Sequence, residues 1–459
     1  MRFLRRIFLP CIILSVCPAL ALSTDETPWP PAYLKTKAAT AIVKSDLFLE
    51  VPSSVETASK DAGAAKFVVA TKAPTVALAY HRNLGPDAAK RRLWSSWGDI
   101  GIARDGKVYS AIGDHGDYLK GDARCFLYVW DPVQQTLEQI VDMNNVVTPR
   151  PDQPAWSKVH AKIDEGPDGK IYFCCTLNDG ERAGKLAWSK QLPGGQLYQY
   201  DPQTKKTVVF ANLPPKRCTA TSLLDQDRGI WWCTLEGGDH ALWGLDLKTR
   251  KPIFQGPAES VKFNRNFAVA RNGAVYFNGA GSLWKYDPVE AKVQPTKAVL
   301  GESQGMRSST AESKAGHIYG TTRPGELFQY TPATDELKML GPAWLKTDYI
   351  TVCTLSPDER FVYYLPGAHG KATRSGTPVV QYEIATARRK VVAFLTKAIE
   401  QETGYIPAGT YGMKISADGS TLYVNFNGHA ADPIRPEHMK PKGFGLCAFA
   451  AIQIPESER

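Results

Sequence analysis

The stretch WSKVHAKIDEGPDGKIYF, residues 156–173, places a histidine at the start of a strand-like segment. Apolar and polar residues alternate before a PDG turn, and an apolar run follows it, which is typical of two antiparallel strands joined by a hairpin. His160 begins the first strand. Histidine transfers protons near neutral pH because its ordinary pKa lies in that range. His160 is therefore a candidate catalytic base, while a purely structural role at a strand end stays open.

The hairpin in this stretch is one of seven degenerate copies of a DGKIY phrase. Consecutive copies, aligned on the central aliphatic residue, lie 63, 59, 45, 43, 44 and 60 residues apart. An alternating segment precedes each copy, and a third segment such as FLYVWDP, QLYQYDP or SLWKYDP follows it, usually before a short fourth one. Four short strands per repeat at this period predict a propeller blade. The aligned aliphatic residues are Val108, Ile171, Ile230, Val275, Ile318, Val362 and Leu422.

These repeats predict an all-β chain, a seven-bladed β-propeller with four-stranded antiparallel blades, over residues 66–456. Closing seven twisted sheets into a ring buries both faces of each blade and leaves few exposed edges. The seventh blade has no obvious fourth strand, and the run KFVVATK at 66–72 is expected to supply it from the N-terminal side. Residues 22–65 are expected to form an N-terminal arm. A ring of six or eight blades remains an alternative if a copy is missed or counted twice.

The repeat also predicts which side chains meet at one mouth of the central channel. The innermost strand of a blade starts at the face to which the second strand returns. Long segments at 142–158, 179–194, 395–410 and 427–442 fall in the loops of that face, which favours it as the functional one. The residues at the inner-strand starts are Trp97, His160, Thr219, Asn264, Arg307, Thr351 and Tyr411. The residues at the second-strand ends are His115, Asn178, Asp179, His240, Arg323, His369 and His429.

Five of the eight histidines of the chain fall in these two rings. Arg307 and Arg323 lie there too, with Arg265 beside the first ring, and these guanidiniums can hold carboxylates while histidine and tyrosine transfer protons. Polar residues gather at any propeller mouth because strand ends meet water, so a structural role stays open for each. The sequence shows no clustered histidines that would predict a metal site, and it names no cofactor.

The N-terminus reads MRFLRRIFLPCIILSVCPALALS, a basic start followed by a short apolar run and a small-x-small site. This pattern predicts a signal peptide over residues 1–21 and a secreted or periplasmic protein. A lipoprotein signal at Cys17 is the alternative. No other run is long and apolar enough to cross a bilayer. Loss of the leader removes three arginines, so the net charge falls from +9 to about +6, and the sequence carries no nucleic-acid-binding motif.

The segment from Lys158 to Phe173 resembles the blade that carries an essential histidine in secreted propeller polysaccharide lyases of the ulvan-lyase type. Oligogalacturonate lyases share the seven-bladed architecture. The specific match covers about one blade, whereas the repeat pattern covers most of the mature chain. The resemblance implies β-elimination on a uronate-containing, anionic polysaccharide or oligosaccharide: a base removes the proton at C5, a cation neutralises the adjacent carboxylate, and an acid protonates the leaving oxygen.

By this resemblance His160 is the first candidate base or neutralising group. The remaining roles follow from the predicted mouth rather than from a motif, with Tyr411 as the first candidate acid and Tyr349 as the second. The blade of His160 has Asn178 and Asp179 where a second histidine would be expected. The catalytic candidates are His160, His115, Tyr411 and Arg307. The substrate-binding candidates are Arg323, Arg265, Asn264, Trp97, His369 and His429.

Two other functions remain open at this stage. A propeller that binds a glycan or a protein without turnover would use exposed aromatic side chains, for which the candidates are Trp156, Trp188 and Trp344. Packing of these side chains between loops and blades is the simpler interpretation. A metal-dependent hydrolase or lactonase ranks third, because such sites need an acidic channel and the inner-strand starts carry no carboxylate.

Overall fold

A computed structural model describes residues 34–459 except for 37, 62, 86, 89–90, 92–93, 115, 117–120, 150–154, 177–194, 216, 220, 237–239, 258–259, 263–264, 301–304, 346–347 and 431–444. The expected signal peptide lies outside the described residues.

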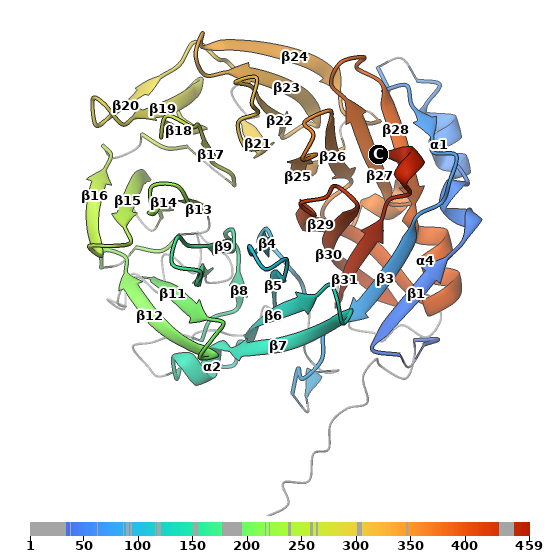
Figure 1. The fold of residues 1–459 in the computed structure, drawn as a ribbon, viewed down its shortest axis with the longest axis horizontal. Helices are drawn as coiled ribbons and strands as arrows, with labels where there is room; N and C mark the ends of the chain where they lie inside the picture. Colours follow the sequence, from blue (N-terminus) through green and yellow to red (C-terminus); the bar gives the residue numbers. More distant parts are fainter. Residues whose placement is uncertain are drawn as a thin grey trace, which may run out of the picture.

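Seven antiparallel sheets stand around a central axis, as predicted, and form a seven-bladed β-propeller (Figure 1). Blade one contains β4 (Gly101–Ile102), β5 (Val108–Gly113), β6 (Cys125–Asp131) and β7 (Thr136–Asp142). Blade two contains β8 (Lys158–Val159), β9 (Asp164–Glu165), β10 (Ile171–Thr176), β11 (Gln196–Asp201) and β12 (Lys206–Asn212). Blade three contains β13 (Ser222–Asp225), β14 (Ile230–Leu235), β15 (Ala241–Asp246) and β16 (Lys251–Gln255). Blade four contains β17 (Ala268–Val269), β18 (Val275–Asn278), β19 (Leu283–Asp287) and β20 (Lys292–Pro295).

The last three blades complete the ring. Blade five contains β21 (Met306–Ser309), β22 (Ile318–Thr322), β23 (Glu326–Thr331) and β24 (Glu336–Pro342). Blade six contains β25 (Ile350–Leu355), β26 (Phe361–Pro366), β27 (Pro378–Glu383) and β28 (Arg389–Phe394), with β2 (Val68–Val69) added at its outer edge. Blade seven contains β29 (Tyr405–Ile415), β30 (Thr421–Ala430), β31 (Leu446–Gln453), β3 (Thr75–Tyr80) and β1 (Thr40–Lys44).

The repeated turn residues explain why each blade folds locally. In the DGK copies, the glycine takes a left-handed backbone conformation between the first and second strands, with φ of +74° at Gly169, which costs least without a Cβ. After the third strand, the aspartate of the YDP signature caps the next turn. Asp131 accepts a hydrogen bond from the backbone N–H of Val133 at 2.9 Å, and such local caps favour a turn over a longer strand.

The strand that closes the ring differs from the one expected. Residues 66–72 do not complete blade seven: Val68–Val69 forms β2 and pairs in parallel with β28 of blade six. The closing strand is β3, which pairs with β31 on one side and with β1 on the other. Its sequence TVALAY is buried on both faces, so it fits between two strands, whereas β2 is an edge strand. Part of the expected N-terminal arm is therefore the fifth strand of blade seven.

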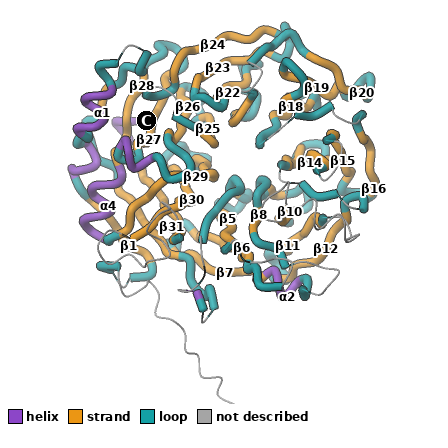
Figure 2. The backbone as a smooth tube through the Cα atoms, turned by 180° about the vertical axis from the view of Figure 1, so that it is seen from behind, coloured by secondary structure: helices purple, strands orange, loops and turns teal. Residues whose placement is uncertain are grey.

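The described helices are short, and two of them, α1 and α4, lie together at one side of the ring (Figure 2). They are α1 (Ser53–Ala58), α2 (Met143–Val146) and α4 (Leu395–Thr403), with the 3₁₀ turns η1 (Asp46–Leu49), η4 (Ala372–Ser375) and η6 (Glu456–Glu458). α1 and α4 pack outside blades six and seven (Figure 2), while α2 follows β7. Within the described part of the chain, no helix has the length and apolar character needed to span a membrane.

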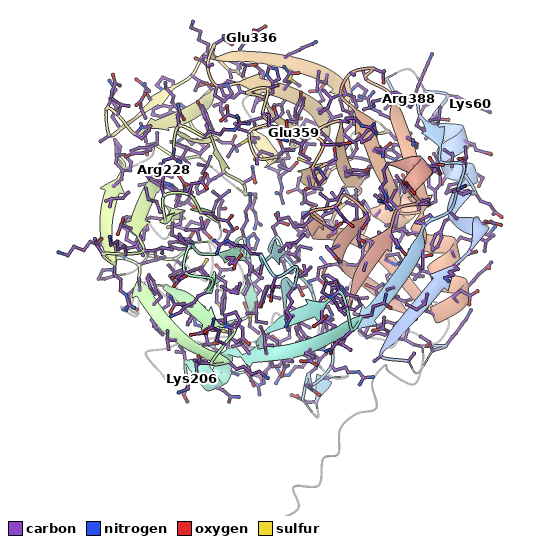
Figure 3. All side chains as sticks on the ribbon, in the orientation of Figure 1. Lys60, Lys206, Arg228, Glu336, Glu359 and Arg388 are labelled. Carbon is purple, nitrogen blue, oxygen red and sulfur yellow. The ribbon has the colours of Figure 1, made fainter. Side chains whose placement is uncertain are left out.

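The core lies between adjacent blades. Tyr109 and Cys125 of blade one, for example, pack against Ile171 and Phe173 of blade two, and burying each such large side chain contributes roughly 1.5–3 kcal/mol. Charged side chains project outward from the outermost strands, as Lys206 and Glu336 do (Figure 3). The fold therefore leaves the channel mouth as the place where polar groups converge inside the ring.

Candidate active site at the channel mouth

Irregular inner strands aim the candidate side chains into the channel. In β21, Met306 pairs with Thr322 and Ser308 pairs with Thr321, so Arg307 is the extra residue of a β-bulge. In β29, Thr410 pairs with Phe426 and Gly412 pairs with Asn425, so Tyr411 is the extra residue of a second β-bulge. A bulge turns a side chain away from the regular alternation of the sheet. Arg307 and Tyr411 reach the channel by this device.

His160 occupies a break in the inner strand of blade two. This inner strand pairs with β10 in two short segments, β8 and β9, and residues 160–163 between them are unpaired in the ladder. Gly98 of blade one packs against this break so closely that an added Cβ would lie 2.3 Å from the carbonyl oxygen of Ala161. This close backbone approach requires glycine, and it places Trp97 beside His160.

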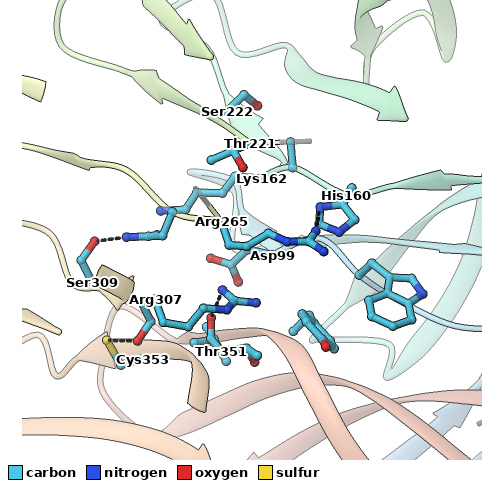
Figure 4. Close-up of a pocket in the computed structure, with 16 residues that line it drawn as sticks. Asp99, His160, Lys162, Thr221, Ser222, Arg265, Arg307, Ser309, Thr351 and Cys353 are labelled. Carbon is cyan, nitrogen blue, oxygen red and sulfur yellow. Dashed lines mark hydrogen bonds between the residues drawn. The ribbon is translucent and has the colours of Figure 1, made fainter. Parts of the chain in front are cut away.

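Candidates from six blades line one small cavity at the mouth (Figure 4), which has a volume of about 30 Å³ and is partly open to solvent. The residues that line it are Trp97, Asp99, His160, Ala161, Lys162, Thr221, Ser222, Arg265, Asn266, Arg307, Ser308, Ser309, Thr351, Val352, Cys353 and Tyr411. Six residues predicted from the repeat therefore lie together: Trp97, His160, Arg265, Arg307, Thr351 and Tyr411.

Arg265 and His160 are joined by a hydrogen bond of 2.6 Å between Nη1 of the arginine and Nδ1 of the histidine (Figure 4). Trp97 lies parallel to the His160 ring, with centroids 6.4 Å apart and an interplanar angle of 10°. His160 is 7% exposed. The histidine is thus held between an indole ring and a guanidinium group.

Arg307 is buried among neutral hydrogen-bond acceptors. Its Nε donates to the hydroxyl of Tyr349, and its Nη1 donates to the carbonyl oxygen of Thr351 at 3.3 Å. Its guanidinium also lies 5.0 Å from the ring centroid of Tyr349 and 5.7 Å from that of Tyr411, at the distance of a cation–π contact. Among the described residues, no carboxylate lies within ion-pair distance of Arg307.

The two arginines affect each other through their charges. Burial, and after it the positive charge of Arg307, lowers the pKa of Arg265. Burial and the repulsion from Arg307 thus outweigh the opposing charge of Glu236 at Arg265. The mouth is therefore a cationic site to which an anion would bind favourably.

Tyr411 and His369 form a second pair beside the arginines. The hydroxyl oxygen of Tyr411 lies 2.9 Å from Nδ1 and 2.8 Å from Nε2 of His369. Tyr349 stacks on the other side of the imidazole, with centroids 5.2 Å apart and planes 10° from parallel. His369 follows β26 in a left-handed conformation, with φ of +62°. Such a conformation is unusual for a residue with a side chain, and residues of this kind gather at functional sites.

The surroundings keep both members of this pair neutral at neutral pH. Burial lowers the pKa of His369 to about 4, and the charges of Arg307, Arg265, Lys371 and Arg323 add to this shift. Burial also raises the pKa of Tyr411 well above its ordinary value. A neutral imidazole can accept a proton and a protonated phenol can donate one. The environment thus separates a base from an acid, as in known acid–base pairs.

Deeper in the channel lies a charged network that sequence reasoning missed. Lys414 forms an ion pair with Asp99, which also accepts a hydrogen bond from the backbone of Met413 at 3.1 Å. Burial lowers the pKa of Lys162 and raises that of Asp164. Asp99 lines the cavity, although no carboxylate stands at the strand starts themselves. The sequence contained a signal for these residues. Side chains on a strand alternate between its two faces, and Asp99 and Lys162 each stand two positions after a predicted mouth residue, Trp97 and His160.

Other predicted residues stand apart from the cavity. Arg323 is exposed in the turn after β22. Its positive charge helps to lower the pKa of His369. His429 lies near the end of β30 with Nδ1 2.9 Å from the carbonyl oxygen of Ala430, and the cavity lining described above does not include it. His115 and Asn264 lie outside the described residues.

Two of the tryptophans considered for sugar stacking are not available for it. Trp156 is 4% exposed and Trp344 is fully buried, and each packs in an interblade core. The large loop aromatics therefore fill the space between loops and blades. Trp188 lies outside the described residues.

Within the described ranges, no three histidine, cysteine, aspartate or glutamate side chains come together as a metal site would require.

No family model and no curated protein sequence matches the chain. Among solved structures, the chain is similar to U3-55K, with a TM-score of 0.51 and 9% identity over 82% of this chain and 98% of that one. It is also similar to hydrazine synthase of Kuenenia stuttgartiensis, with a TM-score of 0.48 and 13% identity over 72% of this chain and 92% of that one. At such low identity, the likeness to U3-55K supports the β-propeller fold and nothing about activity.

Proposed function

We propose that this protein is a polysaccharide lyase that cleaves a uronate-containing glycan by β-elimination at the channel mouth, and that it acts after export. The observation that carries the proposal is the neutral Tyr411–His369 pair next to two arginines, of which Arg307 is buried and Arg265 half-buried. β-Elimination beside a carboxylate needs these three elements: a base, an acid and a cation that holds the carboxylate. The resemblance of the His160 segment to propeller lyases points to the same reaction.

The carboxylate of the substrate is proposed to bind Arg265 and Arg307. Both guanidiniums line the cavity, and the fork of donors on arginine matches a carboxylate. Binding offsets the repulsion between the two cations, and it withdraws electron density from the carboxylate, so that the proton at C5 becomes more acidic. In this arrangement the carboxylate lies inside the cavity and the sugar ring lies at the channel mouth.

The chemical step assigned to Tyr411 and His369 is balanced. The imidazole of His369 takes the proton from C5, and the C–H electron pair forms the C4=C5 double bond. The bond between C4 and the glycosidic oxygen breaks, and that oxygen takes the hydroxyl proton of Tyr411. The imidazolium then returns its proton to the tyrosinate along their 2.8 Å contact, which restores both groups.

This proposal moves the role of base from His160 to His369. Arginine can only donate hydrogen bonds, so Nδ1 of His160 must be the acceptor of its bond with Arg265. The imidazole is then neutral, with its proton on Nε2. Neither nitrogen of His160 can take up a proton while this bond exists. We assign His160 as a positioning residue that orients Arg265 toward the substrate carboxylate.

The test is turnover of uronate-containing polymers by the purified protein, followed as ultraviolet absorbance of the conjugated C4=C5 double bond. Wild-type protein and the rim variant Lys206→Gln are expected to form this product, and Tyr411→Phe is expected to lose it. Folded wild-type protein that forms no unsaturated product across polymers of glucuronate, mannuronate, galacturonate, guluronate and iduronate would refute the proposal. Binding of such polymers without turnover would instead indicate a glycan-binding propeller.

A further inference from the structure

The contact between Tyr411 and His369 bears on the stereochemistry of the substrate. We infer that the site eliminates only from uronates whose C5 hydrogen and C4 oxygen lie on the same face of the sugar ring; this rests on the proposed function. The base and the acid meet at 2.8–2.9 Å. The distance between them decides where each can reach the ring.

Two groups on opposite faces of a pyranose must stand well apart. Each would need its own hydrogen-bond reach of about 3 Å to the atom it serves, so their separation would be roughly 6 Å or more. A pair at 2.8 Å leaves no room for a sugar ring between its members. Tyr411 and His369 can therefore approach a substrate from one side only.

The packing around the pair keeps its members together. Tyr411 is 5% exposed, sits in the bulge of β29, and contacts Trp97 with centroids 4.8 Å apart. His369 is stacked on Tyr349 and lies between Gly367 and Gly370, which both have positive φ. Moving either ring away would break these contacts as well as the hydrogen bond.

His160 and Tyr349 do not supply an acid or a base across the ring, and Asp99, deeper in the channel, is held in an ion pair with Lys414. His160 has Nδ1 bonded to Arg265 and its proton on Nε2, so it accepts no proton. Tyr349, the other phenol, lies against His369 itself. It therefore approaches from the same side. Arg265 and Arg307 remain as carboxylate-binding groups.

The configuration of the sugar then decides whether it can react. In D-glucuronate and D-mannuronate, the C5 hydrogen and the C4 oxygen lie on the same face. In L-iduronate and L-guluronate, which are the respective C5 epimers, they lie on opposite faces, as they do in D-galacturonate. The one-sided pair serves both atoms in the first group. In the second group the pair can reach either the C5 hydrogen or the C4 oxygen, so the remaining atom has no base or no acid.

C5 epimers provide matched substrates for the test, because each pair differs at a single carbon. The initial rate of unsaturated product is measured with wild-type protein on polyglucuronate against iduronate-rich polymer, and on polymannuronate against polyguluronate. We expect turnover of at least one polymer of the first kind, with its epimer slower by about 10²–10⁴-fold, since a missing general acid or base costs that much.

Each outcome has a distinct meaning. Turnover of iduronate, guluronate or galacturonate polymers at rates comparable to or above those of the same-face polymers would overturn the inference and leave the lyase proposal standing. Absence of product from every polymer would overturn the lyase proposal, and the inference with it. Product from same-face polymers alone would support both.

Discussion

Nη1 of Arg265 lies 2.6 Å from Nδ1 of His160, so a residue of blade two orients a guanidinium that precedes the inner strand of blade four. The two residues are 105 positions apart in sequence, and blade three stands between them. The bond crosses the channel mouth and fixes the proton of His160 on Nε2, because arginine is always the donor. In the proposed reaction, the histidine identified first from the sequence would therefore act through this arginine.

His160→Asn tests this role, since the asparagine side-chain oxygen can accept the bond from Arg265. We expect His160→Asn to keep activity within about tenfold, and His160→Leu to raise KM by roughly 10- to 100-fold, because a hydrogen bond to a charged group is worth about 1.5–3 kcal/mol. Steady-state kinetics separate KM from kcat. If the asparagine and leucine variants were equally inactive through kcat, His160 would be the proton acceptor.

Arg307→Lys is expected to lower kcat/KM by about 10²-fold. Lysine keeps the positive charge but loses the planar fork that holds a carboxylate with two bonds. It also loses the bonds to Tyr349 and Thr351. The matched control is Arg388→Lys, at an exposed position on the outer rim, which should behave as wild type. Equal activity of both variants would place the carboxylate elsewhere.

Tyr411→Phe is expected to lower kcat by about 10²–10⁴-fold, the usual contribution of a general acid, with KM little changed. The buried ring keeps its packing against Trp97, so the fold should persist, which circular dichroism can verify. Tyr349→Phe is the paired variant. It removes an acceptor of Arg307 and should act mainly on KM. The reverse pattern would make Tyr349 the acid.

The pH dependence of kcat/KM should show an acidic limb near pH 4. His369 must be neutral to act as base, and its pKa is lowered from 6.5 to about 4, so activity is retained above that pH and lost below it. Arg307→Gln removes one of the cations that depress this pKa, and it should move the limb of the residual activity to higher pH. A limb at the ordinary histidine pKa in wild-type protein would contradict the assignment.

Glu458→Gln tests how much the contacts of the C-terminal segment with Thr71 and Lys390 stabilise the fold. The buried Glu458 carboxylate accepts from the backbone and hydroxyl of Thr71 at 2.7 and 2.5 Å and pairs with Lys390 at 2.9 Å. We expect a loss of roughly 2–3 kcal/mol in the free energy of unfolding, measured by denaturant titration.

The carboxylate of Glu458 also makes the free energy of unfolding depend on pH. Burial opposes ionisation, but the bonds from Thr71 and Lys390 prevail and lower the pKa of Glu458 from 4.5 to about 2. A carboxylate with a depressed folded pKa stabilises the protein above its ordinary pKa, and this stabilisation is lost as pH falls from about 4.5 to 2. The stability difference between wild type and Glu458→Gln should shrink over that range. An unchanged difference would show that the charge is not involved.

The all-β class, a ring of seven blades and the inner-strand positions that face the mouth could be predicted from the sequence. These follow from local rules: glycine turns such as Gly169, aspartate caps such as Asp131, and alternation of buried residues recur in most copies. Several residues at these predicted positions line one cavity, among them Trp97, His160 and Arg307.

The contacts between those side chains could not be predicted from the sequence, because they depend on how the blades pack together. The bond between His160 and Arg265, the pairing of Tyr411 with His369 and the choice of β3 as the closing strand all join segments that are distant in sequence. Alternation predicts which side of a strand a residue faces, but it contains no information about bulges, about a break such as the one at His160, or about which blades' side chains meet across the axis. Those depend on the closure of the ring, which brings all seven inner strands to a common centre.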